Sequence, residues 1–361
     1  MNRIEFGDCR ETMRRWASEG IKAQTCVTSP PYYGLRDYGT GKWVGGDENC
    51  SHKRDSKYSD KTITGHANKD LTVGDAIYKS VCPKCGAVRE DKQLGLEETP
   101  EEYIKSMVEV FRCVWDVLED DGTLWVNIGD SYYNYRPGKG QALVKQTVAN
   151  SEQDLPQTCA RRGNKLDGLK EKDLIGIPWM LAFALRADGW YLRQDIIWHK
   201  PNPMPESVTD RCTKAHEYIF LLSKSPKYYY DHEAIKEEAS SKSEGIRFGG
   251  NKYGDNDDPK YATKSGNVSK EYDKANKRSV WTVPVKPYAG AHFAVFPTDL
   301  IEPCILAGAP VGGIVLDPFM GSGTTAQVAQ DLGRKYLGCE LNPAYQPLQN
   351  KRLAQQSLEL L

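Results

Sequence analysis

The run Thr28-Ser29-Pro30-Pro31-Tyr32-Tyr33 places hydrogen-bond acceptors next to an aromatic face. The residues before it, Ala23 to Val27, have the apolar character of a short buried strand. Two consecutive prolines prevent both continued strand pairing and entry into a helix, so the chain must turn rigidly here. Acceptors beside an aromatic ring at a strand end suit chemistry on an amino group attached to a flat ring. The plain alternative is a rigid turn without a chemical role.

A strand, a glycine turn and a helix start follow one another near the C-terminus. Val311 to Leu316 is typical of a buried strand, and it runs into Asp317-Pro318-Phe319-Met320-Gly321-Ser322-Gly323-Thr324-Thr325. The two glycines allow positive φ and close backbone approach, and the helix start offers unpaired N–H groups to an anionic or carboxylate-bearing ligand. The third glycine of a dinucleotide fingerprint and the Gly-Lys-Ser/Thr ending of a phosphate loop are missing. Their absence from the sequence counts against hydride transfer and phosphoryl transfer.

A further apolar strand, Tyr336 to Asn342, carries Glu340 near its end. An acidic residue about twenty positions after a glycine turn binds ribose hydroxyls in dinucleotide folds. A glutamate at a strand end is otherwise simply solvated, but this separation favours a role in binding. The pattern indicates a cofactor that contains an adenosine.

Together these motifs resemble those of the amino-methylating DNA methyltransferases, which use S-adenosylmethionine to methylate cytosine N4 or adenine N6. In that family a Ser/Asp/Asn-Pro-Pro-Tyr/Phe motif is catalytic, and an Asp-Pro-Phe-x-Gly-Ser-Gly-Thr motif holds the methionine part of the cofactor. The order found here, with the catalytic motif first, is that of the circularly permuted beta group. The resemblance covers most of the chain.

The resemblance implies a role for individual residues. His292 to Pro297 resembles the segment that precedes the cofactor strand, and Gly7-Asp8 resembles the acidic position on the adenine side. The implied catalytic residues are Ser29, Pro30, Pro31 and Tyr32. The implied cofactor-binding residues are Asp8, Phe296, Asp317, Phe319, Gly321, Ser322, Gly323, Thr324, Glu340 and Asn342.

The expected mechanism follows from the chemistry of the acceptor. An exocyclic amine conjugated to its ring has little nucleophilic lone pair. Hydrogen bonds from the amine to the Ser29 side chain and the Pro30 carbonyl would favour a pyramidal nitrogen that attacks the methyl group in line. Tyr32 would stack on the base, which must leave the duplex because its amino group is otherwise paired.

We therefore expect a site-specific DNA methyltransferase that acts on cytosine N4 by base flipping, because Ser at the first motif position is more frequent among the cytosine enzymes. Adenine N6 is the main alternative, since both bases present similar amines. Methylation of RNA or of a protein glutamine is less favoured, because those enzymes usually carry Asn before the prolines and place the cofactor motif first. A non-catalytic DNA-binding regulator that contains zinc is the alternative outside enzymes.

The dipeptide Pro303-Cys304 raises a different reaction, because enzymes that methylate the ring carbon of cytosine attack with a thiolate, commonly in a Pro-Cys pair. Leu300 to Ala307, however, is an apolar helix-like run. A thiol in such a run is usually a small buried hydrophobe. We therefore do not assign Cys304 a catalytic role.

Four other residues have the types and spacing of metal ligands. Cys50-Ser51-His52 and Cys82-Pro83-Lys84-Cys85-Gly86 offer three thiolates and one imidazole, which complete a tetrahedral zinc site without an open position for catalysis. We predict one structural zinc ion held by Cys50, His52, Cys82 and Cys85, with His66 as an alternative to His52. Unpaired surface cysteines in a reducing compartment are the other explanation.

Length and composition fit one enzyme domain with insertions. A chain of 361 residues that is 39% hydrophobic can bury a large α/β core. Met1 to Phe6 has no apolar signal core, and ten cysteines with metal-type spacing indicate a cytoplasmic protein with no membrane segment. The resemblance places the protein in a prokaryote or phage.

The charge bears on the expected partners. A net charge of -1 confines any surface for double-stranded DNA to local patches. A cognate restriction endonuclease is a further expected partner, and both a monomer and a homodimer remain open.

The expected fold is a Rossmann-like S-adenosylmethionine-dependent methyltransferase with a doubly wound, mostly parallel sheet. The patterns predict helices at Pro100 to Leu118, with Thr99 as N-cap, and at Ile177 to Ala187. They predict strands at Thr123 to Gly129, Tyr191 to His199 and Glu217 to Ser223.

The expected organisation has five parts. Residues 1–45 carry the catalytic motif, 46–95 form a zinc-ribbon-like insertion, 96–232 continue the catalytic domain with a flap near 132–173, 233–280 form the target recognition region, and 281–361 bind the cofactor. Phe248 to Tyr253 and Arg161 to Lys165 mix basic, polar and aromatic side chains that suit DNA contacts, although a solvated insertion is the alternative.

The segment from Trp198 through Tyr218 resembles the target-pocket segments of the family. Lys200 and Asn202 are expected to line that pocket. For Lys200, His199, His216 and Glu217 a structural polar role is equally consistent with the sequence, because no spacing among them dictates chemistry.

Overall fold

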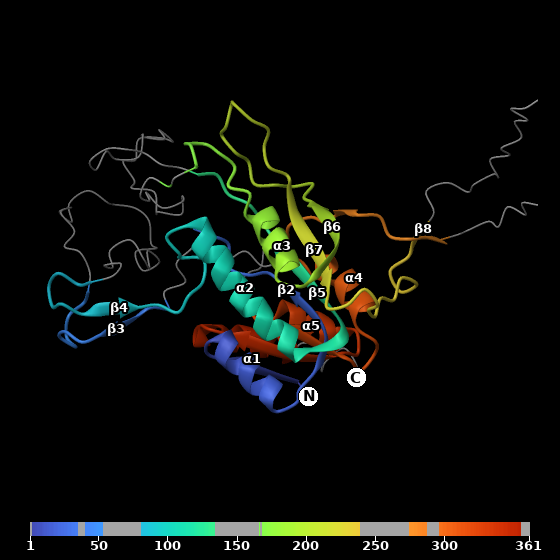
Figure 1. Cartoon of the computed structure of the whole chain (residues 1–361), viewed down its shortest axis with the longest axis horizontal. Helices are drawn as coiled ribbons and strands as arrows, with labels where there is room; N and C mark the ends of the chain where they lie inside the picture. The colour runs from blue at the N-terminus through green and yellow to red at the C-terminus, as the bar shows by residue number, and fades with distance from the viewer. Residues whose placement is uncertain are drawn as a thin grey trace, which may run out of the picture.

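The structure is a computed structural model that describes residues 2–34, 40–52, 81–133, 166, 168–238, 274–286 and 296–354. Within these residues, eight strands form one sheet covered by helices on both faces (Figure 1). In spatial order the strands are β1 (Asn2–Phe6), β12 (Lys335–Glu340), β11 (Ile314–Asp317), β2 (Ala23–Thr28), β5 (Leu118–Ile128), β7 (His216–Ser223), β6 (Tyr191–His199) and β10 (Val280–Thr282). The mostly parallel sheet predicted from the sequence is confirmed.

The strand order interleaves the two ends of the chain. β11 and β12 come late in the sequence, yet they lie between β1 and β2. All neighbours from β1 through β12, β11 and β2 to β5 run parallel, so their carboxyl ends meet at one edge of the sheet. β7 runs antiparallel to both β5 and β6, a reversal that the sequence patterns did not indicate.

Two hydrophobic cores lie on opposite faces of this sheet. α1 (Cys9–Ser18), α2 (Pro100–Val117) and α3 (Ile177–Ala187) bury one face, and α4 (Thr298–Gly308) and α5 (Thr324–Asp331) bury the other (Figure 1). Alternation along β5 separates the cores, because Leu124 and Val126 face the first and Trp125 faces the second. A short 3-10 turn, η2 (Pro343–Tyr345), leads into α6 (Gln346–Ala354), which contacts α5.

Local signals account for several element boundaries. The Thr99 hydroxyl accepts a hydrogen bond from the Glu102 amide at 3.1 Å, and Pro100 opens α2, as predicted. The predicted strand from Val311 begins only at Ile314. The reason is a turn, in which Gly312 has a φ of 79° and the Gly313 amide donates to the Pro310 carbonyl.

Two small ribbons lie outside the main sheet. β3 (Lys42–Val44) and β4 (Val88–Glu90) pair antiparallel and project from the body beside the start of α2 (Figure 1). β8 (Glu237–Glu238) and β9 (Lys274–Ala275) form the second pair. Most of the predicted flap and target recognition region lies outside the described residues, as do Arg161 to Lys165 and Phe248 to Tyr253. Among the described helices, none combines the length and the apolar character needed to cross a membrane.

The packing of α4 on the sheet leads to a stability prediction at Gly308. A Cβ there would lie 2.6 Å from Thr25 Oγ1 and 3.0 Å from Thr123 Oγ1, two hydroxyls that are themselves hydrogen-bonded. We expect Gly308→Ala to lower the free energy of unfolding by about 1–3 kcal/mol, because overpacking displaces neighbouring groups. Urea denaturation followed by circular dichroism measures this change.

Glu302→Ala, on the exposed face of the same helix, is the matched control. It should alter the free energy of unfolding by less than about 0.5 kcal/mol. Wild-type stability in the Gly308 variant would contradict the close helix–sheet contact.

Candidate active site

A cavity of about 610 Å³ lies at the edge of the sheet where the carboxyl ends of β1, β12, β11 and β2 meet. It brings together residues that are hundreds of positions apart in the sequence. Of the predicted site residues, those that line it are Asp8, Ser29, Pro30, Pro31, Tyr32, Phe296, Asp317, Phe319, Gly321, Ser322, Thr324, Glu340 and Asn342. Gly323 does not line it. That residue caps α5 with a φ of 89° and packs against Gln349.

The carboxylate of Asp317 joins the two sequence motifs. It accepts hydrogen bonds from the Thr28 hydroxyl at 2.6 Å, from the Thr325 hydroxyl at 2.6 Å and from the Phe319 amide at 2.9 Å. Its side chain is almost fully buried, and burial raises its pKa to about 6. Asp317 therefore braces the end of β2 against the glycine turn.

Glu340 holds the glycine turn from the end of the neighbouring strand β12. Its two carboxylate oxygens accept from the Gly321 amide and the Asn342 amide, each at 2.7 Å. Burial, together with the charge of Asp317, raises the pKa of Glu340 to about 7. The Asn342 side chain caps the following turn by accepting from the Ala344 amide at 3.0 Å.

The glycine turn contains one polar atom suited to a ligand. Ser322 is 4% exposed, and its buried hydroxyl has no hydrogen-bond partner among the described residues. It lies in the cavity wall just before α5, where helix N–H groups are unpaired. A buried hydroxyl without a partner is costly, so this position fits an acceptor such as a carboxylate.

The Ser-Pro-Pro-Tyr loop is held from the side of α2. The Tyr103 hydroxyl donates to the Pro31 carbonyl at 2.9 Å, and the Tyr33 hydroxyl donates to the Glu98 carbonyl at 3.1 Å. A Cβ on Gly129 would lie 2.7 Å from the Tyr32 ring, so that ring packs against the backbone that follows β5.

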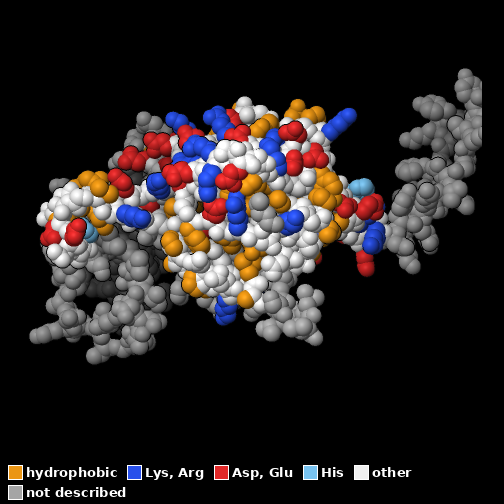
Figure 2. Space-filling view, turned by 90° about the horizontal axis from the view of Figure 1, so that it is seen from below, with side chains coloured by type: hydrophobic (Ala, Val, Ile, Leu, Met, Phe, Trp, Pro, Cys, Tyr) orange, Lys and Arg blue, Asp and Glu red, His pale blue; other side chains and the backbone are white. Residues whose placement is uncertain are grey.

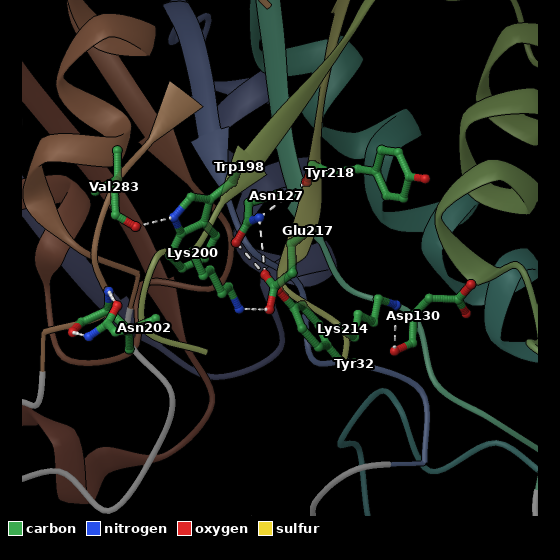
Figure 3. Close-up of polar contacts among 11 residues, drawn as sticks. Tyr32, Asn127, Asp130, Trp198, Lys200, Asn202, Lys214, Glu217, Tyr218 and Val283 are labelled. Carbon is green, nitrogen blue, oxygen red and sulfur yellow. Dashed lines mark hydrogen bonds and ion pairs between the residues drawn. The ribbon is translucent and has the colours of Figure 1, made fainter. Parts of the chain in front are cut away.

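A polar cluster of Glu217, Lys200 and Asn127 surrounds Tyr32, and no spacing in the sequence indicates that these side chains meet (Figure 3). Glu217, on β7, accepts from the Tyr32 hydroxyl at 2.6 Å and from the Asn127 amide at 3.3 Å, and it pairs with Lys200. Burial and the Glu217 charge together raise the pKa of the Tyr32 phenol well above its usual value. The phenol therefore stays protonated and fixed in place.

Lys200 and Trp198 form the next part of the wall. The ammonium of Lys200 lies 4.3 Å from the centre of the Trp198 ring, and the indole N–H donates to the Val283 carbonyl at 2.8 Å (Figure 3). Both side chains line the cavity, whereas Asn202 does not. Asn202 instead bonds the backbone of Val285 through both ends of its amide. The prediction of a cavity position is confirmed for Lys200 and wrong for Asn202.

Asp8 lies at the N-terminus of α1, next to the end of β1. It accepts from the Arg10 amide at 2.9 Å and pairs with the Arg10 guanidinium at 2.7 Å. The pair fixes the carboxylate at the rim of the cavity.

The four predicted metal ligands come together beside the β3–β4 ribbon. The donor atoms of Cys50, His52, Cys82 and Cys85 all lie within 4.8 Å of one another. The Cys50 and Cys82 sulfurs are 3.7 Å apart, and the Cys85 sulfur is 3.5 Å from His52 Nδ1. Sulfur ligands about 2.3 Å from a tetrahedral zinc are separated by about 3.8 Å, so the donor set fits this ion. The alternative ligand His66 lies outside the described residues.

Cys304 is unsuited to nucleophilic chemistry. It is 1% exposed inside α4, its thiol donates weakly to the Leu300 carbonyl, and burial raises its pKa. The thiolate is the reactive form, and this environment opposes it. The interpretation of Cys304 as a small buried hydrophobe is confirmed.

The interleaved parallel sheet, with a glycine turn and an acidic residue at adjacent strand ends, defines a Rossmann-like methyltransferase of the permuted type. The family model described as DNA methylase, N6_N4_Mtase, matches residues 23–351, and the chain belongs to this family. It is a DNA methyltransferase that uses S-adenosylmethionine and acts on cytosine N4 or adenine N6.

Two bacterial relatives cover nearly the whole chain. The chain is 41% identical over 351 residues to the type II methyltransferase M.SmaI of Serratia marcescens, covering 97% of this chain and 90% of that protein. It is 41% identical over 347 residues to the type II methyltransferase M.Cfr9I of Citrobacter freundii, covering 96% and 86%.

Solved structures confirm the predicted fold. The PvuII DNA methyltransferase, described as cytosine-N4-specific, has a TM-score of 0.54 at 15% identity, covering 98% of this chain and 86% of that one. TTHA0409 from Thermus thermophilus, solved with S-adenosyl-L-methionine, has a TM-score of 0.51 at 20% identity, covering 99% and 94%.

The raised pKa of Glu340 leads to a prediction on stability. Its ordinary value is 4.5, and the folded value is about 7, so the folded chain holds a proton that the unfolded chain loses. The contribution of this proton to the free energy of unfolding is fully present below pH 4.5, and it is lost as pH rises through about 7. Glu340→Gln cannot ionise, so the stability of the wild type relative to this variant should fall with rising pH.

Urea titrations at several pH values across this range measure the difference. Glu302→Gln, on the exposed face of α4, serves as the control and should follow the wild type. A constant difference between wild type and Glu340→Gln would refute the assignment.

Proposed function

We propose that the chain methylates the N4 amino group of cytosine in duplex DNA, using S-adenosylmethionine as methyl donor. The observation that carries the proposal is one cavity lined by both the Ser-Pro-Pro-Tyr loop and the glycine turn with Glu340. A methyl donor held by the turn and an amine held by the loop meet in this space. A DNA-binding regulator would need no such arrangement.

The cofactor contacts follow from the donors and acceptors in the cavity wall. The Ser322 hydroxyl and the N-terminus of α5 suit the methionine carboxylate, and Glu340 suits the ribose hydroxyls. Asp8, which lines the same cavity, suits the adenine side, and Asp317 keeps the turn in position through its threonine contacts. When bound, the cofactor supplies an electrophilic methyl group.

The catalytic loop prepares the amine. The Ser29 hydroxyl and the Pro30 carbonyl accept hydrogen bonds from the exocyclic amine, which shifts its lone pair from the ring towards the methyl group. Tyr32, fixed by Glu217, stacks on the flipped base. These contacts are preorganised, and they strengthen as the nitrogen becomes positive in the transition state.

Lys200 supports cytosine as the target. Its ammonium carries three donors, of which one meets Glu217, and it lines the same cavity as Ser29. On the Watson–Crick edge, cytosine presents ring N3 and the O2 carbonyl as acceptors beside its amine. Adenine presents ring N1 and a C–H on that edge, and its other acceptor, N7, lies on the opposite side of the amine. A cationic donor that faces the Watson–Crick edge therefore fits cytosine better. Adenine N6 is the second candidate, because the amine contacts serve either base.

Nucleoside mass spectrometry after incubation with mixed-sequence duplex DNA and S-adenosylmethionine tests the function. We expect N4-methylcytosine, whereas N6-methyladenine would select the second candidate. The absence of any methylated base on DNA of broad sequence coverage would contradict both.

Ser29→Ala tests the catalytic loop. We expect cofactor affinity to stay unchanged in calorimetry while the methylation rate falls by about 10²–10³-fold, as for a lost transition-state contact. Ser18→Ala, an exposed serine at the end of α1, is the control. Near-normal turnover of the Ser29 variant would reject the proposed role.

We also propose one structural zinc ion held by Cys50, His52, Cys82 and Cys85. The sulfur–sulfur and sulfur–nitrogen separations support a closed tetrahedral site. His52 is further supported by Trp43, whose ring stacks on the imidazole at a centroid distance of 4.4 Å. Metal binding would stabilise a ribbon that has little core of its own.

Mass spectrometry under native conditions should detect one zinc ion per chain. Cys82→Ser should lose the ion and lower the melting temperature, because three ligands bind zinc less well than four. Cys212→Ser, at an exposed cysteine outside the cluster, should keep the zinc ion and the melting temperature of the wild type. An unchanged metal content in the Cys82 variant would refute this ligand set.

The type II names of M.SmaI and M.Cfr9I favour a role in restriction–modification for this chain. We propose that its methylation protects DNA from a cognate endonuclease and takes place in the cytoplasm. Basic and acidic side chains are interspersed over the upper part of the face seen in Figure 2. This mixture is consistent with DNA contacts confined to local patches.

A further inference from the structure

Met204 lies at the rim of the active-site cavity and faces solvent. Its side chain is 86% exposed, the highest value among the exposed large hydrophobic side chains of the described residues. Single exposed apolar side chains are common on protein surfaces. Met204 differs from them because it lines the same cavity as Ser29 and Tyr32.

The segment that carries Met204 is fixed to the body of the protein. The Lys200 amide donates to the Ala215 carbonyl at 2.8 Å, which closes the base of the loop between β6 and β7. The Asn202 amide group donates to the Val285 carbonyl at 3.0 Å and accepts from the Val285 amide at 2.9 Å. Figure 3 shows Asn202 on the side of the cluster where Trp198 and Lys200 lie.

Prolines immediately precede Asn202 and flank Met204 on both sides. Each proline restricts φ to a narrow range and limits the residue before it. The backbone of this exposed segment is therefore stiff. The Met204 side chain projects from a defined point at the entrance to the cavity.

A flipped base leaves an empty space in the duplex. Proteins that open base steps often insert an apolar side chain such as Phe, Leu, Ile, Met or Pro. Methionine suits this task, because its unbranched, polarisable side chain adapts to flat neighbouring surfaces. An exposed methionine on a stiff loop beside the base-binding cavity has the chemistry and the position for insertion.

We propose that Met204 enters the DNA duplex and fills the space left by the flipped target base. This inference rests on the proposed base-flipping methylation. The flipped base and the methionine then exchange places, so the neighbouring bases keep an apolar surface to stack against. Met204 is a positioning residue, since it does not contact the reacting amine.

The test compares two duplexes that carry the site found by mapping methylated bases in plasmid DNA. In one the target base is normally paired, and in the other it lies opposite an abasic site, where it leaves the helix more easily. We expect Met204→Ala to lower kcat/KM on the paired duplex by about tenfold, with a loss of less than about twofold on the abasic duplex. Met204→Leu, which keeps the apolar volume, should restore most of the activity.

Each other outcome has a clear meaning. An equal loss on both duplexes, or no loss on the paired one, would overturn the insertion role. Weaker S-adenosylmethionine binding by Met204→Ala in calorimetry would assign the residue to the cofactor wall instead. The absence of any methylated base in the plasmid mapping would refute the proposed function itself, and with it this inference.

Discussion

The buried carboxylate of Asp317 holds the active site together. It binds the Thr28 hydroxyl on one oxygen and the Thr325 hydroxyl on the other, so it links β2, β11 and α5. Thr28 and Asp317 are 289 positions apart in the chain. A buried carboxylate is tolerated only when such partners satisfy it. The Ser-Pro-Pro-Tyr loop after β2 and the glycine turn after β11 are therefore fixed relative to each other by one side chain.

The local features were predictable because their causes are local. Thr99 and Pro100 start a helix wherever they occur with an amphipathic run behind them, and the prolines after Ser29 force a turn in any context. The glycine turn was predictable in the same way, because Gly321 and Gly323 allow the positive φ that a tight turn requires. The family resemblance then supplied what local patterns do not contain, namely that both motifs belong to one cavity.

Other features depend on contacts between distant strands. For Glu217 the sequence leaves both a structural role and a role in the site open, because nothing near it in the sequence indicates Tyr32 or Lys200 as partners. Those contacts exist because β7 runs antiparallel to its neighbours β5 and β6. The spacing of apolar residues predicts a strand but not the direction in which it runs in the sheet. Asn202 is a second example. Its side-chain amide bonds the backbone of Val285, 83 positions away, and no local pattern predicts this contact, so the expected position in the cavity wall is wrong.

The chain returns from the ribbon that carries the proposed zinc site to the Ser-Pro-Pro-Tyr loop. The Gly34 amide donates to the Gly95 carbonyl at 2.9 Å, and the Thr40 hydroxyl donates to Asp91 at 2.8 Å. Gly95 has a φ of 88°, and a Cβ there would lie 2.9 Å from the Tyr32 carbonyl. The C-terminal end of the insertion is thus tied beside Tyr32. An ion at the proposed zinc site would therefore stabilise a ribbon whose return segment ends at Gly95, beside the Tyr32 carbonyl.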